Sequence, residues 1–294
     1  MKRITAALLF VFLAMPLAAA EVKKSPKPDY DASDFYLRVI TPPGKKTPRT
    51  LETVIAKFAG KDGLTVDLVA AVHVGDKKYY EKLNEQFKKY DVVLYELVAD
   101  EGHPVDKESF TQRDGNVLSI FQEGMAEMLK LEHQLHHVDY TADNFVHADL
   151  APEEFFKRFS ERGDLLQTLM RAILISLKKQ GDEKAMQKEM YAQGRFLGAM
   201  MASDPSRPLK RTLASMMSDQ MRDGTWMIGG DGSAIITDRN AACLDVLRKT
   251  IREGKKRIAI FYGGAHLPEF AKSLEKEFKL HYVESDWLVA WDMN

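Results

Sequence analysis

Two short patterns in this chain combine an apolar run, a histidine and a glutamate. In the first, His73 ends the apolar run 69–72, the stretch 77–90 has the spacing of a helix, and a second apolar run, 92–95, ends at Glu96. An apolar run, a helix and another apolar run are typical of a βαβ unit with parallel strands. Such a unit places both polar residues at the carboxyl ends of strands, the sheet edge where ligand and catalytic groups gather.

The second pattern repeats this order near the C-terminus. The apolar run 258–262 leads through Gly263 to His266, residues 267–278 have the spacing of a helix, and the next apolar run ends at Glu284. We therefore expect a second βαβ unit. Polar residues flank Glu284, so we expect it to be more exposed than the glutamate of the first pattern.

Two imidazoles and a carboxylate are a chemically useful set. His73 and His266 each follow a small residue three positions earlier, Ala70 and Gly263, which lets a ligand or another backbone approach closely. Neutral imidazoles with one carboxylate make an open metal site that leaves positions for water and substrate. A buried, unpaired Glu96 would be costly and would have a raised pKa, which suits a metal ligand or a general base. A salt bridge is the structural alternative.

An arginine stands at the start of a predicted helix. Arg239 lies between Asp238 and Asn240, and the helix is expected over residues 235–251. An arginine that faces the strand ends can hold a carboxylate or stabilise a developing oxyanion. A surface ion pair is the alternative for Arg239.

A cluster of histidines occupies the middle of the chain. Spacings of three and four place helical residues on one face, but an extended pattern follows, so we expect the helix to stop near His133. A second metal site and a solvated helix end are both open interpretations. The cluster consists of His133, His136, His137, Asp139 and His147.

Charge and the N-terminal residues bound the class of protein. The formal net charge of -1 argues against nucleic acid as a partner, because phosphate binding needs a clustered cationic surface. Residues 1–20 have the basic start, apolar middle and small-residue end of a secretory signal peptide. Its loss with Lys2 and Arg3 changes the net charge from -1 to -3. No run reaches the ~18 apolar residues of a spanning helix. We expect an exported protein, periplasmic or secreted, without stable membrane insertion; an uncleaved anchor is the alternative.

The chain has the texture of one α/β domain with an insertion. We expect a mixed, largely parallel sheet built from two βαβ-containing halves. The single cysteine, Cys243, excludes an internal disulfide, and eleven of the fourteen methionines lie between Met125 and Met227. Their faces suit either a groove for an apolar ligand or ordinary helix packing. The expected parts are a signal peptide (1–20), a flexible lead-in (21–34), a first α/β half (35–105), a helical insertion (106–227) and a second α/β half (228–294).

These motifs resemble those of the TraB/GumN family, which includes the animal TIKI proteases that act on Wnt. Residues 70–73 are similar to its early Gly-x-x-His motif, with Ala70 in place of glycine. Residues 91–97 resemble its acidic strand, residues 237–240 its arginine motif, and residues 263–266 its late Gly-x-x-His motif. The resemblance covers about 35–105 and 228–292, and the order and spacing of the motifs carry it more than any one of them.

The resemblance implies a metal-dependent hydrolase, and together with the signal peptide it leads us to expect an exported peptidase with a peptide or protein substrate. It implies that His73, His266 and Glu96 bind a divalent ion (manganese, cobalt or zinc) or activate its water, and that Arg239 stabilises an oxyanion or orients a substrate terminus. The methyl group of Ala70 adds bulk where the family has glycine. The wider superfamily also includes erythromycin esterases and haem-binding ChaN-like lipoproteins. A non-catalytic protein that binds haem or another apolar ligand is therefore the alternative.

Overall fold

The computed structural model describes residue 29 and residues 35–99, 127–161, 183–222 and 234–294. The expected signal peptide, and all of the expected lead-in but residue 29, lie outside these ranges. None of the helices within them is both long and apolar enough to span a lipid bilayer.

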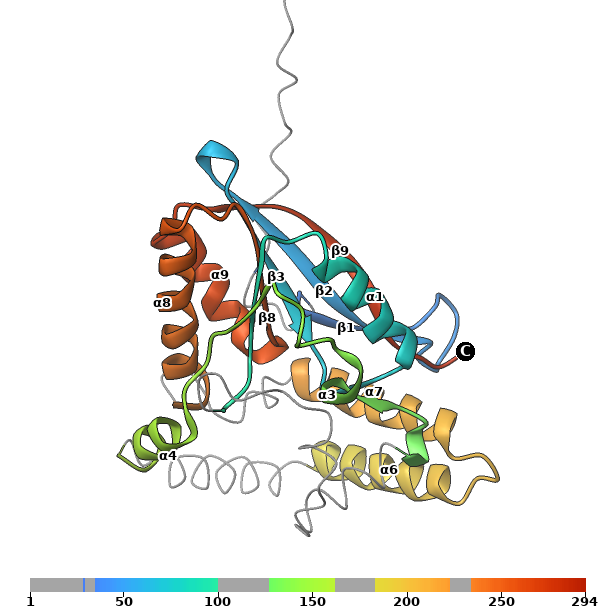
Figure 1. The fold of residues 1–294 in the computed structure, drawn as a ribbon. Coiled ribbons are helices and arrows are strands. Elements are labelled where there is room, and N and C mark those ends of the chain that lie inside the picture. The colour runs from blue at the N-terminus through green and yellow to red at the C-terminus, as the bar shows by residue number, and fades with distance from the viewer. Residues whose placement is uncertain (1–28, 30–34, 100–126, 162–182, 223–233) are drawn as a thin grey trace, which may run out of the picture.

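A seven-stranded sheet forms the centre of the molecule (Figure 1). Four strands run parallel in the spatial order β3, β8, β5, β7. The hairpin strand β2 is antiparallel to β3, and β9 lies antiparallel along the whole of β2. The sheet is thus mixed and mostly parallel, as the sequence predicts. Its strands are β1 (Leu37–Ile40), β2 (Thr50–Ala59), β3 (Thr65–Ala71), β5 (Val92–Tyr95), β7 (Phe145–His147), β8 (Arg257–Gly263) and β9 (His281–Asp292).

Strand β8 brings the two halves of the chain together. It lies between β3 and β5, pairing Gly263 with Ala71 on one side and Phe261 with Tyr95 on the other. Because all three strands point the same way, their carboxyl ends share one edge of the sheet. The two patterns that are far apart in the sequence therefore end side by side.

The second pattern departs from the expected βαβ unit. The helix after β8 leads to β9, which pairs with β2 at the other side of the sheet and not with a strand next to β8. Residues 281–292 form one continuous strand, so Glu284 lies within it, opposite Lys57. The exposed fraction of the Glu284 side chain is 62%, which confirms the expected exposure and removes Glu284 from the shared edge.

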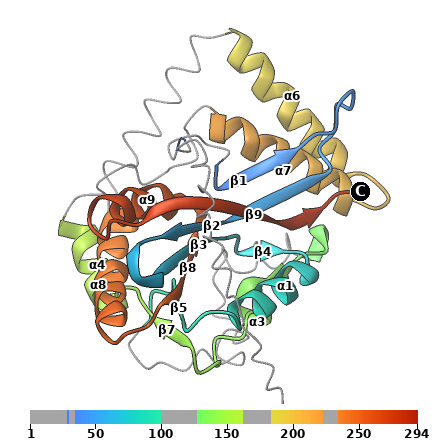
Figure 2. The same ribbon diagram turned by 90° about the horizontal axis from the view of Figure 1, so that it is seen from above.

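Helices cover both faces of the sheet. Figures 1 and 2 show α1 and α3 on one side and α8 and α9 on the other, while α6 and α7 pack together beside the sheet. The helices are α1 (Lys77–Phe87), α3 (Gln134–His137), α4 (Pro152–Glu161), α6 (Glu183–Met200), α7 (Ser206–Arg222), α8 (Arg239–Arg252) and α9 (Leu267–Lys276). Single-turn segments are η1 (Lys61–Gly63), η2 (Ala234–Asp238) and η3 (Gly264–His266).

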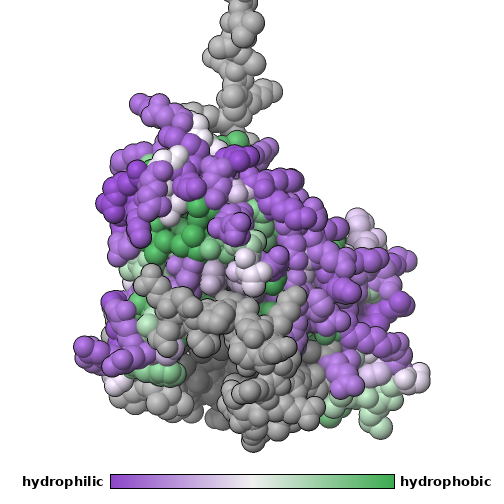
Figure 3. All heavy atoms as spheres, viewed as in Figure 1, coloured by the Kyte–Doolittle hydropathy of each residue, from purple (hydrophilic) through white to green (hydrophobic). Residues whose placement is uncertain are grey.

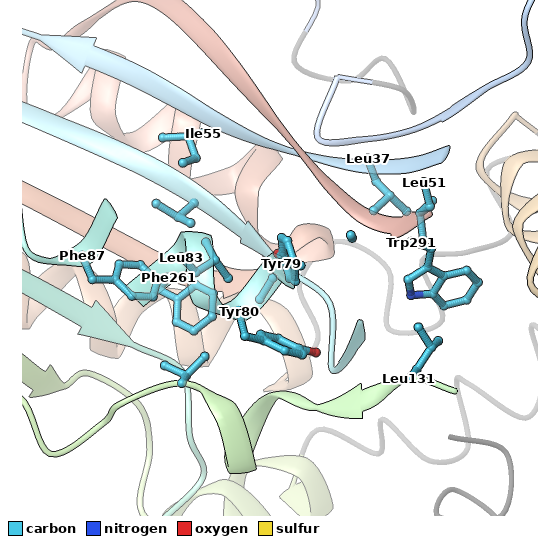
Figure 4. Packing of buried hydrophobic residues seen from close by; sticks show 14 of the residues in the cluster. Leu37, Leu51, Ile55, Tyr79, Tyr80, Leu83, Phe87, Leu131, Phe261 and Trp291 are labelled. Carbon is cyan, nitrogen blue, oxygen red and sulfur yellow. The ribbon is translucent and has the colours of Figure 1, made fainter. Parts of the chain in front are cut away.

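Alternation along the strands builds two apolar cores. In β3, Val66, Leu68 and Ala70 pack toward α8 and α9, whereas Val69 and Ala71 pack toward α1. Figure 4 shows the second of these cores, where Tyr79, Tyr80, Leu83 and Phe87 of α1 meet the sheet. Both faces of the parallel strands are buried, and this packing on two sides holds the end of each strand in place.

The middle of the chain contains strands as well as helices. Residues 106–227 were expected to be helical, but within the described part β7 adds to the sheet beside β5, and β6 (Glu132–His133) pairs with β4 (Val74–Gly75). β7 is three residues long and gains its stability from pairing with an apolar neighbour, which periodicity within the segment does not reveal.

Polar residues dominate the face of the molecule seen in Figure 3, with a smaller apolar area. Large apolar side chains are nevertheless exposed on α6. They are Met186, Met190, Tyr191, Leu197 and Met200.

Candidate functional site

Polar residues from four parallel strands meet at the shared edge. Glu96 directly follows β5, Gly263 ends β8, Asp149 lies two residues beyond β7, and His73 lies two residues beyond β3. Parallel pairing places the ends of β5 and β7 together, because the N–H of Ala148 donates to the Tyr95 carbonyl at 3.2 Å. This is the edge at which open α/β sheets bind ligands.

Both carboxylate oxygens of Glu96 have partners. The N–H of Gly263 donates to Oε2 at 2.6 Å, and Nη2 of Arg239 lies 2.8 Å from Oε1. The Nε2 atom of His266 lies 3.6 Å from the same Oε1. The Glu96 side chain is 12% exposed, so this apolar run does end in a nearly buried carboxylate, as the sequence predicts.

Arg239 joins two carboxylates. Its Nε donates to Oδ1 of Asp149 at 2.9 Å and its Nη2 to Oδ2 at 2.5 Å, so the Asp149 contact is bidentate. The Asp149 side chain is fully buried, and that of Arg239 is 11% exposed. A surface ion pair, the alternative for Arg239, is excluded by this burial. Within the described residues the Nη1 group makes no hydrogen bond.

His266 is buried between two helices and the sheet. It lies in η3 just before α9, and Oδ1 of Asn240 in α8 is 2.7 Å from its Nδ1. The ring also meets the edge of Tyr262, at 5.2 Å between centroids, and the Tyr262 hydroxyl donates to the Ala148 carbonyl. These contacts leave Nε2 as the atom of the ring that faces Glu96.

Burial and charge set the protonation states of the two facing groups. Burial lowers the pKa of His266 to about 4, against the opposing effect of the Glu96 charge. Burial opposes ionisation of Glu96, but the charges of His266 and Arg239 and the N–H of Gly263 together lower the pKa of its carboxyl. The raised pKa expected for an unpaired Glu96 is therefore wrong, and the alternative, a salt bridge to a helix arginine, is present. At neutral pH the site therefore holds a neutral imidazole beside a carboxylate.

His73 stands at the margin of this site. Its side chain is exposed, and its carbonyl accepts a hydrogen bond from the N–H of Gln134 at 2.9 Å. The charge of His73 acts on both Glu96 and His266, but within the described residues its side chain bonds to neither. The structure thus brings Glu96, His266 and Arg239 together and leaves His73 beside them. In the described ranges no group of three or more His, Cys, Asp or Glu side chains is arranged to hold a metal ion.

Gly263 and Ala70, the small residues three positions before His266 and His73, have different roles. A Cβ at Gly263 would lie 3.3 Å from Oε2 of Glu96, so the glycine permits the close approach of the carboxylate to its N–H. Ala70 is fully buried within β3, and its carbonyl accepts a hydrogen bond from Tyr79 at 3.0 Å. The Ala70 methyl group therefore packs in the core on the α8 and α9 side.

Sequence reasoning missed two residues of the site. Asp149 holds Arg239, and Asn240 holds His266. Asp149 follows the short apolar stretch that becomes β7, and its signal was a carboxylate after such a stretch. Asn240 was noted only as a neighbour of Arg239. Its place in the sequence, directly after the arginine in a predicted helix, gives no sign that it contacts a histidine 26 residues away.

The central histidine cluster is spread over several contacts. His133 ends β6, and the helix α3 begins directly after it, so the expectation that a helix stops near His133 is wrong. Its ring is 5.8 Å from that of His136. His137 bonds to Glu132 at 3.0 Å, and Nε2 of His147 lies 2.6 Å from the Leu97 carbonyl. Asp139 accepts hydrogen bonds from Thr141. These side chains do not converge within the described part of the chain.

Comparisons with protein-family models, with curated proteins and with solved structures found no significant match to this chain.

Proposed function

We propose that this chain is an exported metal-dependent hydrolase, most closely a peptidase, whose site lies at the shared strand edge. One observation carries the proposal: a neutral His266 faces the Glu96 carboxylate across 3.6 Å, at the end of two parallel strands. This separation is too long for a hydrogen bond. It suits two ligands of one ion, since each would lie about 2 Å from the metal.

The charge of the cluster supports the binding of a cation. Glu96 and Asp149 carry two negative charges, Arg239 carries one positive charge, and His266 is neutral near pH 7. Among these four described residues, one negative charge is therefore not balanced in a nearly buried place, where charges interact strongly. The fit is incomplete without a third protein ligand. The exposed His73 is the candidate, because its charge acts on both members of the pair.

The residues of the chain have distinct parts in such a reaction. A bound divalent ion polarises a carbonyl and lowers the pKa of water. Arg239 and the N–H of Gly263 hold Glu96 in its ionised form, which is the form that would bind the ion, and its lowered pKa makes it a weaker base toward an attacking water. Asp149 and Glu96 use the Nε and Nη2 groups of Arg239, and among the described residues Nη1 has no partner, so Nη1 would be the group that meets a negatively charged oxygen of the substrate. The choice of a peptide substrate rests on the motif resemblance alone, and export rests on residues 1–20.

Hydrolysis of a casein peptide mixture with added Mn²⁺ tests this function. We expect His73→Ala, His266→Ala and Glu96→Gln each to abolish Mn²⁺-dependent hydrolysis while the protein stays folded. His281→Ala replaces an exposed histidine of β9 and should keep full activity. Full activity in any one of the three site variants would remove that residue from its role, and activity in all three would contradict the proposal.

The exposed methionines of α6 favour a second candidate function. Met190 is 68% exposed and Met186 50%, which suits contact with haem or another apolar ligand. An absorption spectrum with added haem separates the two candidates. A Soret shift that is lost on replacement of one histidine supports binding, whereas no shift together with one bound manganese ion per chain supports hydrolysis.

A further inference from the structure

Both polar atoms of the Asn240 side chain have partners at the site. It is 1% exposed, and it is the second residue of α8. Its Nδ2 group donates to the His266 carbonyl at 3.2 Å and to Oε2 of Glu269 at 3.1 Å. Its Oδ1 atom lies 2.7 Å from Nδ1 of His266.

These partners fix the orientation of the amide. The reverse orientation would point the Asn240 oxygen at a carbonyl and a carboxylate, which both only accept hydrogen bonds. Oδ1 must therefore face the ring. Because a carbonyl oxygen only accepts, the Nδ1 atom of His266 must carry the hydrogen, and a neutral imidazole has one N–H. The lone pair then lies on Nε2, which faces Glu96 at 3.6 Å.

We propose that Asn240 is a positioning residue that selects the Nδ1–H tautomer of His266 and so keeps its Nε2 lone pair toward Glu96. The tautomer itself follows from these contacts. Its role in holding a metal ion rests on the proposed function. In metal sites of proteins, a partner that accepts the second ring N–H of a ligating histidine fixes the tautomer and the direction of the ring.

The position needs one group that accepts a hydrogen bond and one that donates, and an asparagine side chain provides both. An aspartate could accept from Nδ1 but could not donate to the His266 carbonyl or to Glu269, and it would place a second carboxylate beside the first. An apolar residue would leave Nδ1 without an acceptor. Among the described partners of the ring, Oε1 of Glu96 is the acceptor that remains, 3.6 Å from Nε2, and we expect the hydrogen to move to Nε2. That change removes the lone pair from the gap.

The tautomer can be observed directly in the metal-free protein. We would record the ring nitrogen resonances of the full chain labelled with ¹⁵N-histidine at pH 7, and assign His266 from the signals lost in His266→Gln. The wild type should show a protonated Nδ1 and an unprotonated Nε2, and Asn240→Ala should exchange the two. A protonated Nε2 in the wild type overturns the inference, and so does an unchanged tautomer in Asn240→Ala. The wild-type spectrum decides alone if the variant does not fold.

Asn84→Ala is the matched control. Asn84 also binds a histidine backbone, with Nδ2 2.8 Å from the His137 carbonyl, and its Oδ1 accepts from the N–H of Asp139. The substitution removes comparable hydrogen bonds far from the shared strand edge, so it should leave the His266 tautomer unchanged. An exchange of the tautomer in Asn84→Ala would mean that general loosening, and not the Asn240 contact, sets the ring state.

Titration with Zn²⁺ separates this inference from the proposed function. We expect Zn²⁺ to shift Nε2 of His266 and to bind about 10- to 100-fold more weakly to Asn240→Ala, with about twofold change at most in Asn84→Ala. A wild type with protonated Nδ1 that binds no Zn²⁺ supports tautomer selection and contradicts the metal-dependent function. A wild type that binds Zn²⁺ but carries its hydrogen on Nε2 when metal-free supports the function and overturns the inference.

Discussion

At the residue scale, the site is a chain of charges between buried side chains. Asp149, Arg239 and Glu96 alternate in sign, and the fully buried Asp149 lies at the end with the least contact with water. A buried charge that loses its partner is strongly destabilising, whereas an exposed pair contributes little. Asp149 is therefore the residue that fixes the guanidinium of Arg239 in the site.

Asp149→Asn tests this position. We expect the free energy of unfolding to fall by about 3 kcal/mol, because Arg239 keeps only Glu96 as a charged partner. Urea unfolding measures the change. Asp245→Asn is the control, since Asp245 pairs with Arg248 at 2.6 Å in an exposed place, and it should change stability by less than about 0.5 kcal/mol. Equal effects of the two substitutions would mean that the buried triad does not hold the site together.

Single residues could be proposed from the sequence only where their type was unusual for its surroundings. Glu96 was found because a carboxylate ended an apolar run, and the structure places it 12% exposed among charged partners. Asp149 had only the weaker signal of a carboxylate after a much shorter apolar stretch, and Asn240 had none, because an asparagine at a helix start is common at surfaces. Their roles come from contacts across the fold.

At the element scale, the site depends on where β8 and β7 enter the sheet. The helices α1, α8 and α9 follow from local periodicity, and the structure has them close to the predicted bounds. Insertion of β8 between β3 and β5, and the pairing of β9 with β2, are choices of long-range partner. Periodicity gives the faces of a strand but not its neighbours, so the second pattern was predicted as a parallel unit that the sheet does not contain.

A buried ion pair ties α7 to the loop before α1. Nζ of Lys210 lies 2.6 Å from Oδ1 of Asp76, with the lysine side chain 8% exposed, and the other Asp76 oxygen accepts from the N–H of Asp292 at 2.5 Å. Asp76 therefore joins a helix of the middle segment to both α1 and β9. We infer that this contact holds α7 against the sheet.

Lys210→Ala should loosen α7 before it affects the sheet. We expect faster amide hydrogen exchange over Ser206–Arg222, with unchanged exchange in β3 and β8. Lys130→Ala removes an exposed pair with Asp204 at 3.0 Å and should leave exchange in α7 unaltered. If α7 is equally protected in Lys210→Ala and in the wild type, other contacts anchor the helix.

At the scale of the whole molecule, the site makes stability depend on pH. The folded protein holds His266 with a pKa of about 4, lowered by burial from the ordinary 6.5. Below pH 6.5 the His266 imidazole therefore binds a proton in the unfolded chain, whereas in the folded protein it stays neutral down to about pH 4. The contribution of the neutral His266 to the free energy of unfolding is fully present above pH 6.5 and is lost as the pH falls toward 4. The lowered pKa of Glu96 acts in the same direction at the acid end of this window.

We expect the free energy of unfolding to fall by about 2 to 3 kcal/mol between pH 7.5 and pH 4.5 through His266 alone. Urea unfolding at the two values measures it. In His266→Gln the same change of pH should cost about 2 to 3 kcal/mol less than in the wild type. A variant whose stability falls as steeply as that of the wild type would show that other groups cause the acid lability.

The proposed function requires that the gap between His266 and Glu96 binds a divalent ion. Calorimetric titration of the full chain with Mn²⁺ tests it most directly, with His266→Gln and the exposed-site control His281→Gln beside the wild type. We expect one ion per chain in the wild type and the control, and none in His266→Gln although that variant remains folded. No binding in the wild type, or equal binding in His266→Gln, would contradict it.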